Sequence, residues 1–168
     1  MTPDVRTIRV STPIAADPDA VFALIIDLPG YNDWLPTSSA YKGTTEVTDT
    51  PIVVGTKYIE RSPSGTRYGE VCELDHVQRH VAFKQPMRLI FGLEIRIRVD
   101  MKVSDTTAGA AQGIHLSGVH LSSVVDRTVT LDFPWYMFPV AGVISGQFEQ
   151  EIKRTMSEMR KYLENQAT

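Results

Sequence analysis

The segment "GLEIRIRVDMKV", residues 92–103, constrains the fold of this chain more than any other stretch. Its apolar members are Leu93, Ile95, Ile97, Val99, Met101 and Val103, and every residue between them is charged. Because successive side chains of a β-strand point to opposite faces, one face of this strand meets an apolar interior and the other meets water. The pattern is typical of an antiparallel sheet that is covered on one side only.

Further strands are expected on both sides of this segment. Residues 5–14 alternate in the same way, and residues 37–91 break into short strand candidates separated by turn signals such as "RSPSGTR". Residues 114–133 read as one long strand stretch. The apolar residues are even-numbered before Gly118, as at Ile114 and Leu116, and odd-numbered after it, as at Val119 and Leu121. This switch predicts a β-bulge or a bend near Gly118.

Two segments show helical spacing instead. Asp17 suits an N-cap, Pro18 suits the first helical position, and an apolar stripe follows as far as Leu28. The C-terminal stripe is longer and consists of Val140, Ile144, Phe148, Ile152, Met156, Met159 and Leu163. The order is strand, one or two short helices, about six strands and a long helix. It predicts an α+β architecture with the helices on one side of an antiparallel sheet.

Length and composition indicate one globular domain, residues 1–168. Of the 168 residues, 42% are hydrophobic and 22% charged, and the net charge is -3. No basic face is evident, which argues against nucleic acid as a partner, and no apolar run is long enough to span a membrane. The N-terminus is polar, unlike a signal peptide, and Cys72 is the only cysteine, so a reducing, cytoplasmic setting is expected.

A compact aromatic segment, "GYNDWLP" at residues 30–36, follows the first helix candidate. A single helical turn there would bring Tyr31, Trp34 and Leu35 to one side. That side either plugs a core or closes the mouth of a hollow interior. We predict that Trp34 is partly buried and lines or gates a pocket, with Tyr31 beside it.

Four stretches of the sequence resemble the START-like superfamily, also called the SRPBCC or polyketide cyclase/dehydrase and lipid-transport group. They are "STPIAADPDAVFALIIDL", "YNDWLP", "VGTKY" with the later "GEVCELD", and "GQFEQEIKRTMSEMRKYLEN", so the resemblance covers nearly the whole chain. It implies a helix-grip fold, in which a curved antiparallel sheet wraps a long C-terminal helix around a deep pocket, with two short helices after the first strand. Members of the group include hydrophobic-ligand carriers, quinone-binding respiratory proteins and aromatase/cyclases, and fold alone does not choose among them.

Small residues near the start of the C-terminal helix indicate where a cavity would leave room. Gly142, Ser145 and Gly146 lie there, whereas the later stripe residues are bulky. Glycine inside a helix costs about 1 kcal/mol relative to alanine, although Gly146 would also admit close packing of a neighbouring aromatic ring. The predicted ligand-binding residues are Tyr31, Trp34, Tyr58, Tyr68, Ile97, Trp135, Gly142, Ile144, Ser145 and Phe148.

Glu60 and Glu70 are the predicted catalytic residues if the protein is an enzyme. A carboxylate aimed into an apolar pocket has a raised pKa and can act as a general acid or base. Tyr58 and Glu60 share a parity on one strand, and Tyr68 and Glu70 share one on the next, so the two strands could present all four together. The alternative is that both carboxylates face water, because the two parities of residues 56–76 are nearly equal in apolar content.

The sequence gives little support for a ligand-binding arginine, a metal site or a reactive cysteine. The resemblance implies that aromatase/cyclases use a pocket arginine, but Arg61 and Arg67 flank a turn here and are expected to be solvated. No cofactor motif is present, and His76 and His80 flank a turn where they would not converge with a third ligand, so neither cofactor nor metal is expected. Cys72 has no evident base beside it and is expected to be inert.

The aromatic segment "FPWYMFP", residues 133–139, has two interpretations. Such a cluster usually packs in a core, but it can also form an exposed apolar rim that makes a transient membrane contact or meets a ligand's tail.

The function expected from sequence is binding of a mostly apolar small molecule in an internal cavity. A lipid, an isoprenoid quinone or an aromatic polyketide would suit such a cavity. The alternatives are a polyketide aromatase/cyclase of secondary metabolism and, more weakly, a protein-interaction module with a filled interior. No oligomeric state is predicted.

Overall fold

The computed structural model describes residues 2–106 and 123–166. The elements in chain order are β1 (Asp4–Ile14), α1 (Pro18–Ile26), α2 (Tyr31–Trp34), β2 (Thr44–Thr45), β3 (Lys57–Ser62), β4 (Gly65–Asp75), β5 (His80–Lys84), β6 (Met87–Leu89), β7 (Glu94–Asp105), β8 (Ser123–Phe133), η3 (Trp135–Met137) and α3 (Phe138–Gln166). The predicted α+β order is confirmed. The bulge predicted near Gly118 lies outside the described residues.

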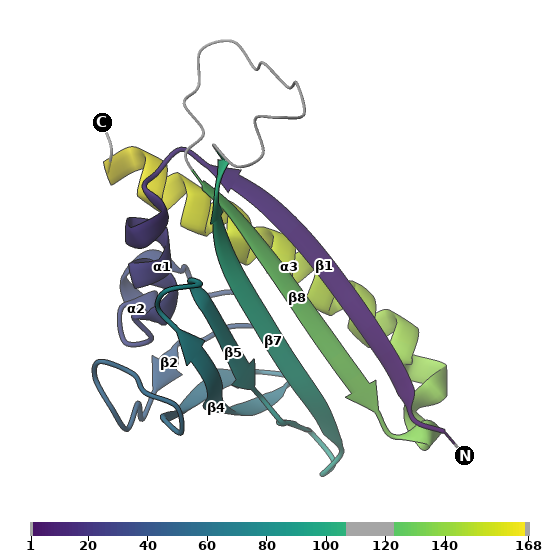
Figure 1. Ribbon diagram of the computed structural model, residues 1–168. Coiled ribbons are helices and arrows are strands. Elements are labelled where there is room, and N and C mark those ends of the chain that lie inside the picture. The colour runs from purple at the N-terminus through teal and green to yellow at the C-terminus, as the bar shows by residue number, and fades with distance from the viewer. Residues whose placement is uncertain (1, 107–122, 167–168) are drawn as a thin grey trace.

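The strands form one antiparallel sheet in the order β1-β8-β7-β5-β4-β3-β2, with β6 paired to both β4 and β7. Figure 1 shows the long α3 running diagonally behind β8 and β1, while α1 and α2 lie toward its C-terminal half. A curved sheet wrapped around a long C-terminal helix is the predicted helix-grip arrangement. No helix in the described part of the chain is long and apolar enough to cross a membrane.

The alternation of residues 93–103 is confirmed in β7. Ile95, Ile97, Val99, Met101 and Val103 are all buried, and the charged residues between them are not. We call the face of the sheet that carries these buried side chains the inner face. It packs against the helices and supplies half of the buried hydrophobic core.

The first helix begins as its sequence predicts. The Asp17 side chain accepts hydrogen bonds from the backbone N–H groups of Asp19 and Ala20, and Pro18 occupies the first turn. These bonds satisfy amide groups that a helix leaves unpaired at its N-terminus. The buried side of α1 includes Val21 and Ile25.

Strand β4 contains a β-bulge between Val71 and Glu73, where its register against β5 shifts. Val71 is buried on the inner face, and Leu74, after the bulge, also packs against the core. The intervening Cys72 and Glu73 both lie toward the outer face, where they contact Arg98. A bulge of this kind bends the strand and increases its twist.

Two glycines give a matched pair of expected results. A Cβ at Gly69 of β4 would overlap the Tyr58 ring, which lies directly over it, whereas a Cβ at Gly146 of α3 would meet nothing. We therefore expect Gly69→Ala to destabilise the protein by about 1–3 kcal/mol or more, and Gly146→Ala to stabilise it by up to about 1 kcal/mol. Urea unfolding followed by circular dichroism measures both, and equal effects of the two substitutions would contradict this packing.

Candidate functional site

A pocket lies between the inner face of the sheet, the α1–α2 segment and α3. It is lined by Leu28, Tyr31, Leu35, Tyr41, Tyr58, Glu60, Arg67, Phe83, Gln85, Ile97, Val99, Met101, Arg127, Val129, Phe148, Glu151, Ile152, Thr155 and Met159. The space between these side chains is about 720 Å³ when its opening to solvent is included. The part wide enough to hold the centre of a water molecule is about 50 Å³, which is room for a few water molecules.

An ion pair between neighbouring strands lies at one wall of the pocket. The register of β3 and β4 places Glu60 opposite Arg67, and Arg67 Nη2 lies 3.1 Å from Glu60 Oε2. Only 9% of the Glu60 side chain and 12% of the Arg67 side chain are exposed. Arg67 also donates a hydrogen bond to the Ala40 carbonyl oxygen, which ties β4 to the segment after α2.

A second arginine, Arg127, reaches the pocket from β8. It shares the parity of the buried Val125 and Val129, and it is paired with Met101 of β7, so it lies on the inner face. Burial lowers the pKa of Arg127 from its ordinary value. Within residues 2–106 and 123–166, no hydrogen bond or salt bridge is formed by this guanidinium group, and its buried Nε has no partner.

Neutral hydrogen-bonding groups complete the polar part of the pocket. Gln85 Nε2 donates to the Tyr58 hydroxyl over 2.6 Å, and the Tyr31 hydroxyl donates to the Ile25 carbonyl over 2.8 Å. Burial raises the pKa of both tyrosine hydroxyls above the ordinary value, so both remain protonated at neutral pH. The pocket therefore combines apolar walls with a buried polar cluster.

Helix α3 contributes the opposite wall. Phe148, Ile152, Thr155 and Met159 line the pocket, while the carboxylate of Glu151 is held by Arg154 at 2.6 Å. The Thr155 hydroxyl donates to the backbone of its own helix, at the Glu151 carbonyl. The pocket faces the middle of α3 rather than its N-terminal turns.

The structure brings together some of the ten predicted ligand-binding residues. Those that line the pocket are Tyr31, Tyr58, Ile97 and Phe148, together with the predicted catalytic Glu60. Those outside its lining are Trp34, Tyr68, Trp135, Gly142, Ile144 and Ser145, together with Glu70. Their placement follows from strand register and helix rotation, which the sequence pattern alone left open.

Of the two arrangements left open for β3 and β4, the grouping of Tyr58, Glu60, Tyr68 and Glu70 on one face is wrong. Tyr58 pairs with Gly69 and Ile59 pairs with Tyr68, so Tyr68 lies on the outer face. Glu70 is exposed on that same outer face, where an open groove also contains Tyr68. Antiparallel register, rather than shared odd or even numbering, decides which residues of adjacent strands meet.

The expected cavity against the first turns of α3 is also wrong. Gly142 and Gly146 are exposed, and Ser145 uses its hydroxyl to donate to the Ala141 carbonyl of the same helix. Ile144 is half-buried and packs against the core outside the pocket. Small residues here mark a solvent-facing side of the helix.

Trp34 is buried without lining the pocket. Its ring lies 5.0 Å from that of Tyr31 and 6.4 Å from that of Tyr162 on α3, centroid to centroid, and only 5% of the residue is exposed. Tyr31, one turn earlier, is the aromatic residue of "GYNDWLP" that reaches the pocket. These contacts favour the core-plug interpretation of Trp34.

The segment at residues 133–139 is divided between core and surface. Phe133 and Met137 are buried, while Trp135, Tyr136 and Phe138 are exposed. With 54% of its surface exposed, Trp135 contributes to an apolar surface at the start of α3.

The polar pocket residues that sequence reasoning missed are Tyr41, Arg67, Gln85, Arg127, Glu151 and Thr155. Arg67 was expected to be solvated, and its burial is explained by the partner that register supplies, Glu60. Arg127 could have been identified from the sequence, because it lies among the alternate apolar residues Val125, Val129 and Leu131 of "SVVDRTVTLDF". A charged residue on the buried face of a strand is uncommon and points to a site.

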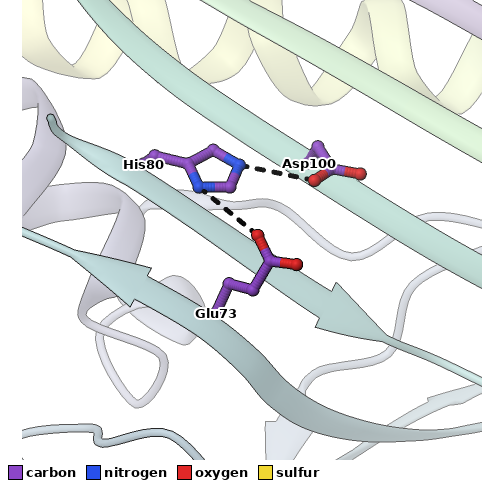
Figure 2. A group of neighbouring side chains, drawn as sticks. All are labelled: Glu73, His80 and Asp100. Atoms are coloured by element: carbon purple, nitrogen blue, oxygen red, sulfur yellow. Dashed lines mark hydrogen bonds and ion pairs between the residues drawn. The ribbon is translucent and has the colours of Figure 1, made fainter.

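A cluster on the outer face has the side-chain types of a metal site. Figure 2 shows His80 between Glu73 and Asp100, with its ring nitrogens 3.8 Å and 3.3 Å from the two carboxylates. Arg98 binds both carboxylates, at 2.7 Å and 2.9 Å. Because a guanidinium group already neutralises these carboxylates, a cation would have to displace it, and the cluster is better explained as a salt-bridge network.

Cys72 lies beside this network rather than in the pocket. Its thiol contacts the Ala82 carbonyl, and burial raises the pKa of the thiol from its ordinary value. A thiol that stays protonated is a weak nucleophile.

Comparison with known proteins agrees with this geometry. The family model described as polyketide cyclase/dehydrase and lipid transport matches residues 5–164. Norcoclaurine synthase from Thalictrum flavum, solved as a point mutant with a transition-state analogue, superposes with a TM-score of 0.71 at 14% identity, covering 100% of this chain and 99% of that one. Ara h 8.0201 superposes with a TM-score of 0.68 at 13% identity, covering 96% and 99%.

A further structure of the Thalictrum flavum synthase, in complex with dopamine and hydroxybenzaldehyde, has a TM-score of 0.64 at 13% identity and covers 93% and 87% of the two chains. Among curated proteins no match was found. Structural similarity at these identities establishes the fold, and the family match spans nearly the whole chain. The chain therefore belongs to the polyketide cyclase/dehydrase and lipid transport family.

Proposed function

We propose that this protein binds a mostly apolar small molecule, such as a lipid, an isoprenoid quinone or an aromatic polyketide, in the pocket between the inner face of the sheet and α3. The observation that carries the proposal is the pocket itself. Aliphatic and aromatic side chains of the α1–α2 segment, the sheet and α3 supply most of its wall, and polar groups are placed on both the sheet and α3. Apolar walls with a small number of placed polar groups are typical of small-molecule sites.

The volume of the pocket sets a condition on binding. A space that holds a few water molecules is too narrow for a lipid or a polyketide, so the ligand must widen it. The pocket is open to solvent on one side, and its α3 wall includes the half-buried Phe148. We expect ligand binding to move side chains of this kind rather than the strands of the sheet.

The test uses the neutral apolar fluorophore N-phenyl-1-naphthylamine and two phenylalanine substitutions on α3. Thr155→Phe adds a ring inside the pocket, and Gly146→Phe adds one on the exposed side of the same helix. The wild type and Gly146→Phe should bind the fluorophore with matching affinity. The affinity of Thr155→Phe should be lower by at least about tenfold, because the added ring occupies the space of the ligand. Circular dichroism checks that both variants are folded. Undiminished binding by folded Thr155→Phe would show that the ligand lies elsewhere.

An enzyme of the polyketide aromatase/cyclase type is the second candidate, favoured by the position of Glu60. This carboxylate lies in the pocket, within reach of a bound substrate, whereas Glu70 lies on the outer face. Glu60→Gln keeps the size of the side chain and removes its ability to take up a proton. If Glu60 is a general base, turnover of a polyketide substrate should fall about 10²–10⁴-fold with ligand binding retained.

The remaining expectations from sequence stay predictions. They are a single ligand-binding domain over residues 1–168, a cytoplasmic location, and a transient membrane contact. The exposed Trp135, Tyr136 and Phe138 support the last of these, because exposed aromatic groups suit a membrane interface.

A further inference from the structure

Within residues 2–106 and 123–166, one guanidinium group of the pocket has no carboxylate partner. Four charged side chains contribute to its wall, namely Glu60, Arg67, Arg127 and Glu151. Glu60 is paired with Arg67, and Glu151 is paired with Arg154 through two hydrogen bonds of 2.6 Å and 3.0 Å. Each carboxylate therefore has a guanidinium group of its own, and Arg127 remains as an additional positive charge.

Among the described residues, no carboxylate forms a salt bridge with Arg127. Of the acidic side chains that act on it electrostatically, Glu60 is already paired with Arg67, and Tyr31 and Tyr58 keep their hydroxyl protons at neutral pH because they are buried. The Nε of Arg127 and the Nε of Arg67 are both buried without a hydrogen-bond partner among the described residues. Buried charges are normally paired, and an unpaired one is costly to maintain.

We propose that Arg127 recognises the acidic group of an organic anion, an apolar molecule that carries one carboxylate or comparable oxyanion. This inference rests on the proposed function and specifies the chemical class of its ligand. A guanidinium group presents two parallel N–H donors that match the two oxygens of such a group. The buried side chains of β7 beside Arg127, including Val99 and Met101, would then contact the apolar part of the ligand.

The cavity explains how Arg127 is accommodated without its ligand. The space of about 50 Å³ admits a few water molecules, which can hydrate the guanidinium group. A carboxylate that enters the pocket replaces this hydration with charge-assisted hydrogen bonds. A neutral ligand of the same shape displaces the same water without that compensation and should bind more weakly.

Two fluorophores that differ by one acidic group provide the test. 8-Anilinonaphthalene-1-sulfonate is N-phenyl-1-naphthylamine with an added sulfonate, so the pair separates the charge from the apolar body. Arg127→Met removes the charge and keeps the length of the side chain. Arg96→Met is the matched control, because Arg96 lies on the outer face of β7 with 81% of its side chain exposed.

We expect Arg127→Met to lower the affinity for the anionic fluorophore by about tenfold or more, while the affinity for the neutral fluorophore changes by less than about threefold. Arg96→Met should leave both affinities unchanged. Arg127→Lys should keep part of the preference for the anion, since it retains the charge without the paired donors. The melting temperature of Arg127→Met should equal or exceed that of the wild type, because a half-buried charge with no carboxylate partner among the described residues is lost.

The outcomes distinguish this inference from the function on which it rests. If the wild type binds the neutral fluorophore and Arg127→Met leaves the anionic affinity unchanged, the pocket binds ligands but the anion site is wrong. Equal losses for both fluorophores would mean that Arg127 only shapes the pocket, and would also overturn the site. If the wild type binds neither fluorophore, the proposed function and the anion site are both wrong.

Discussion

Replacing Glu60 with alanine should lower the free energy of unfolding by about 3–5 kcal/mol, because the substitution leaves the Arg67 guanidinium group buried and unpaired. The two side chains are 9% and 12% exposed, so water cannot readily take over the role of the carboxylate. Urea unfolding followed by circular dichroism measures the loss.

Two controls separate the buried charge from the loss of the glutamate itself. Glu46→Ala breaks the exposed pair between Glu46 and Arg61 and should cost no more than about 1 kcal/mol. The double variant Glu60→Ala/Arg67→Met should recover much of the stability, because it removes both charges and leaves no unpaired ion. If Glu60→Ala costs as little as Glu46→Ala, the Glu60–Arg67 pair is effectively solvated.

Trp34→Ala should cost about 3–5 kcal/mol in stability and leave fluorophore binding within about threefold of the wild type. The indole packs between Tyr31 and Tyr162 and is outside the lining of the pocket, so its loss creates a hole in the core. Its Nε1–H has no hydrogen-bond partner among the described residues. Trp34→Phe should therefore cost less, since it keeps an aromatic ring and removes that unsatisfied donor.

The Trp135→Phe background isolates the fluorescence of Trp34, because the chain has only these two tryptophans. Ligand addition should leave the Trp34 emission nearly unchanged. Strong quenching, together with a small stability loss in Trp34→Ala, would show that this residue is a gate.

The sequence was most informative where a single pattern decided the structure. The strict alternation of β7 identified its buried face, and Asp17 with Pro18 identified the start of α1. In each case the deciding pattern is local to one element: alternate apolar residues identify a strand, and a capping residue identifies the start of a helix. The family resemblance then supplied the way in which these elements enclose α3.

Contacts between elements were harder to obtain from the sequence. The two parities of residues 56–76 have similar apolar content, and only the pairing of Glu60 with Arg67 and of Tyr58 with Gly69 shows which side chains face the pocket. The start of α3 was misread for a related reason, since a small residue indicates space without saying whether ligand or solvent occupies it. Arg127 could have been found by asking why a charge interrupts a buried parity.

The β-bulge of β4 makes chain length, rather than side-chain chemistry, decide which residues at the end of this strand face the core. Arg67 and Gly69 precede the bulge, Leu74 follows it, and the additional residue between them is what allows both halves of the strand to keep their inner-face side chains inside. A relative that lacks one residue here would have a straighter β4, or its inward-facing and outward-facing residues after this point would exchange places. Deleting Cys72 should therefore turn Leu74 out of the core and disturb packing more than a substitution at Cys72 does.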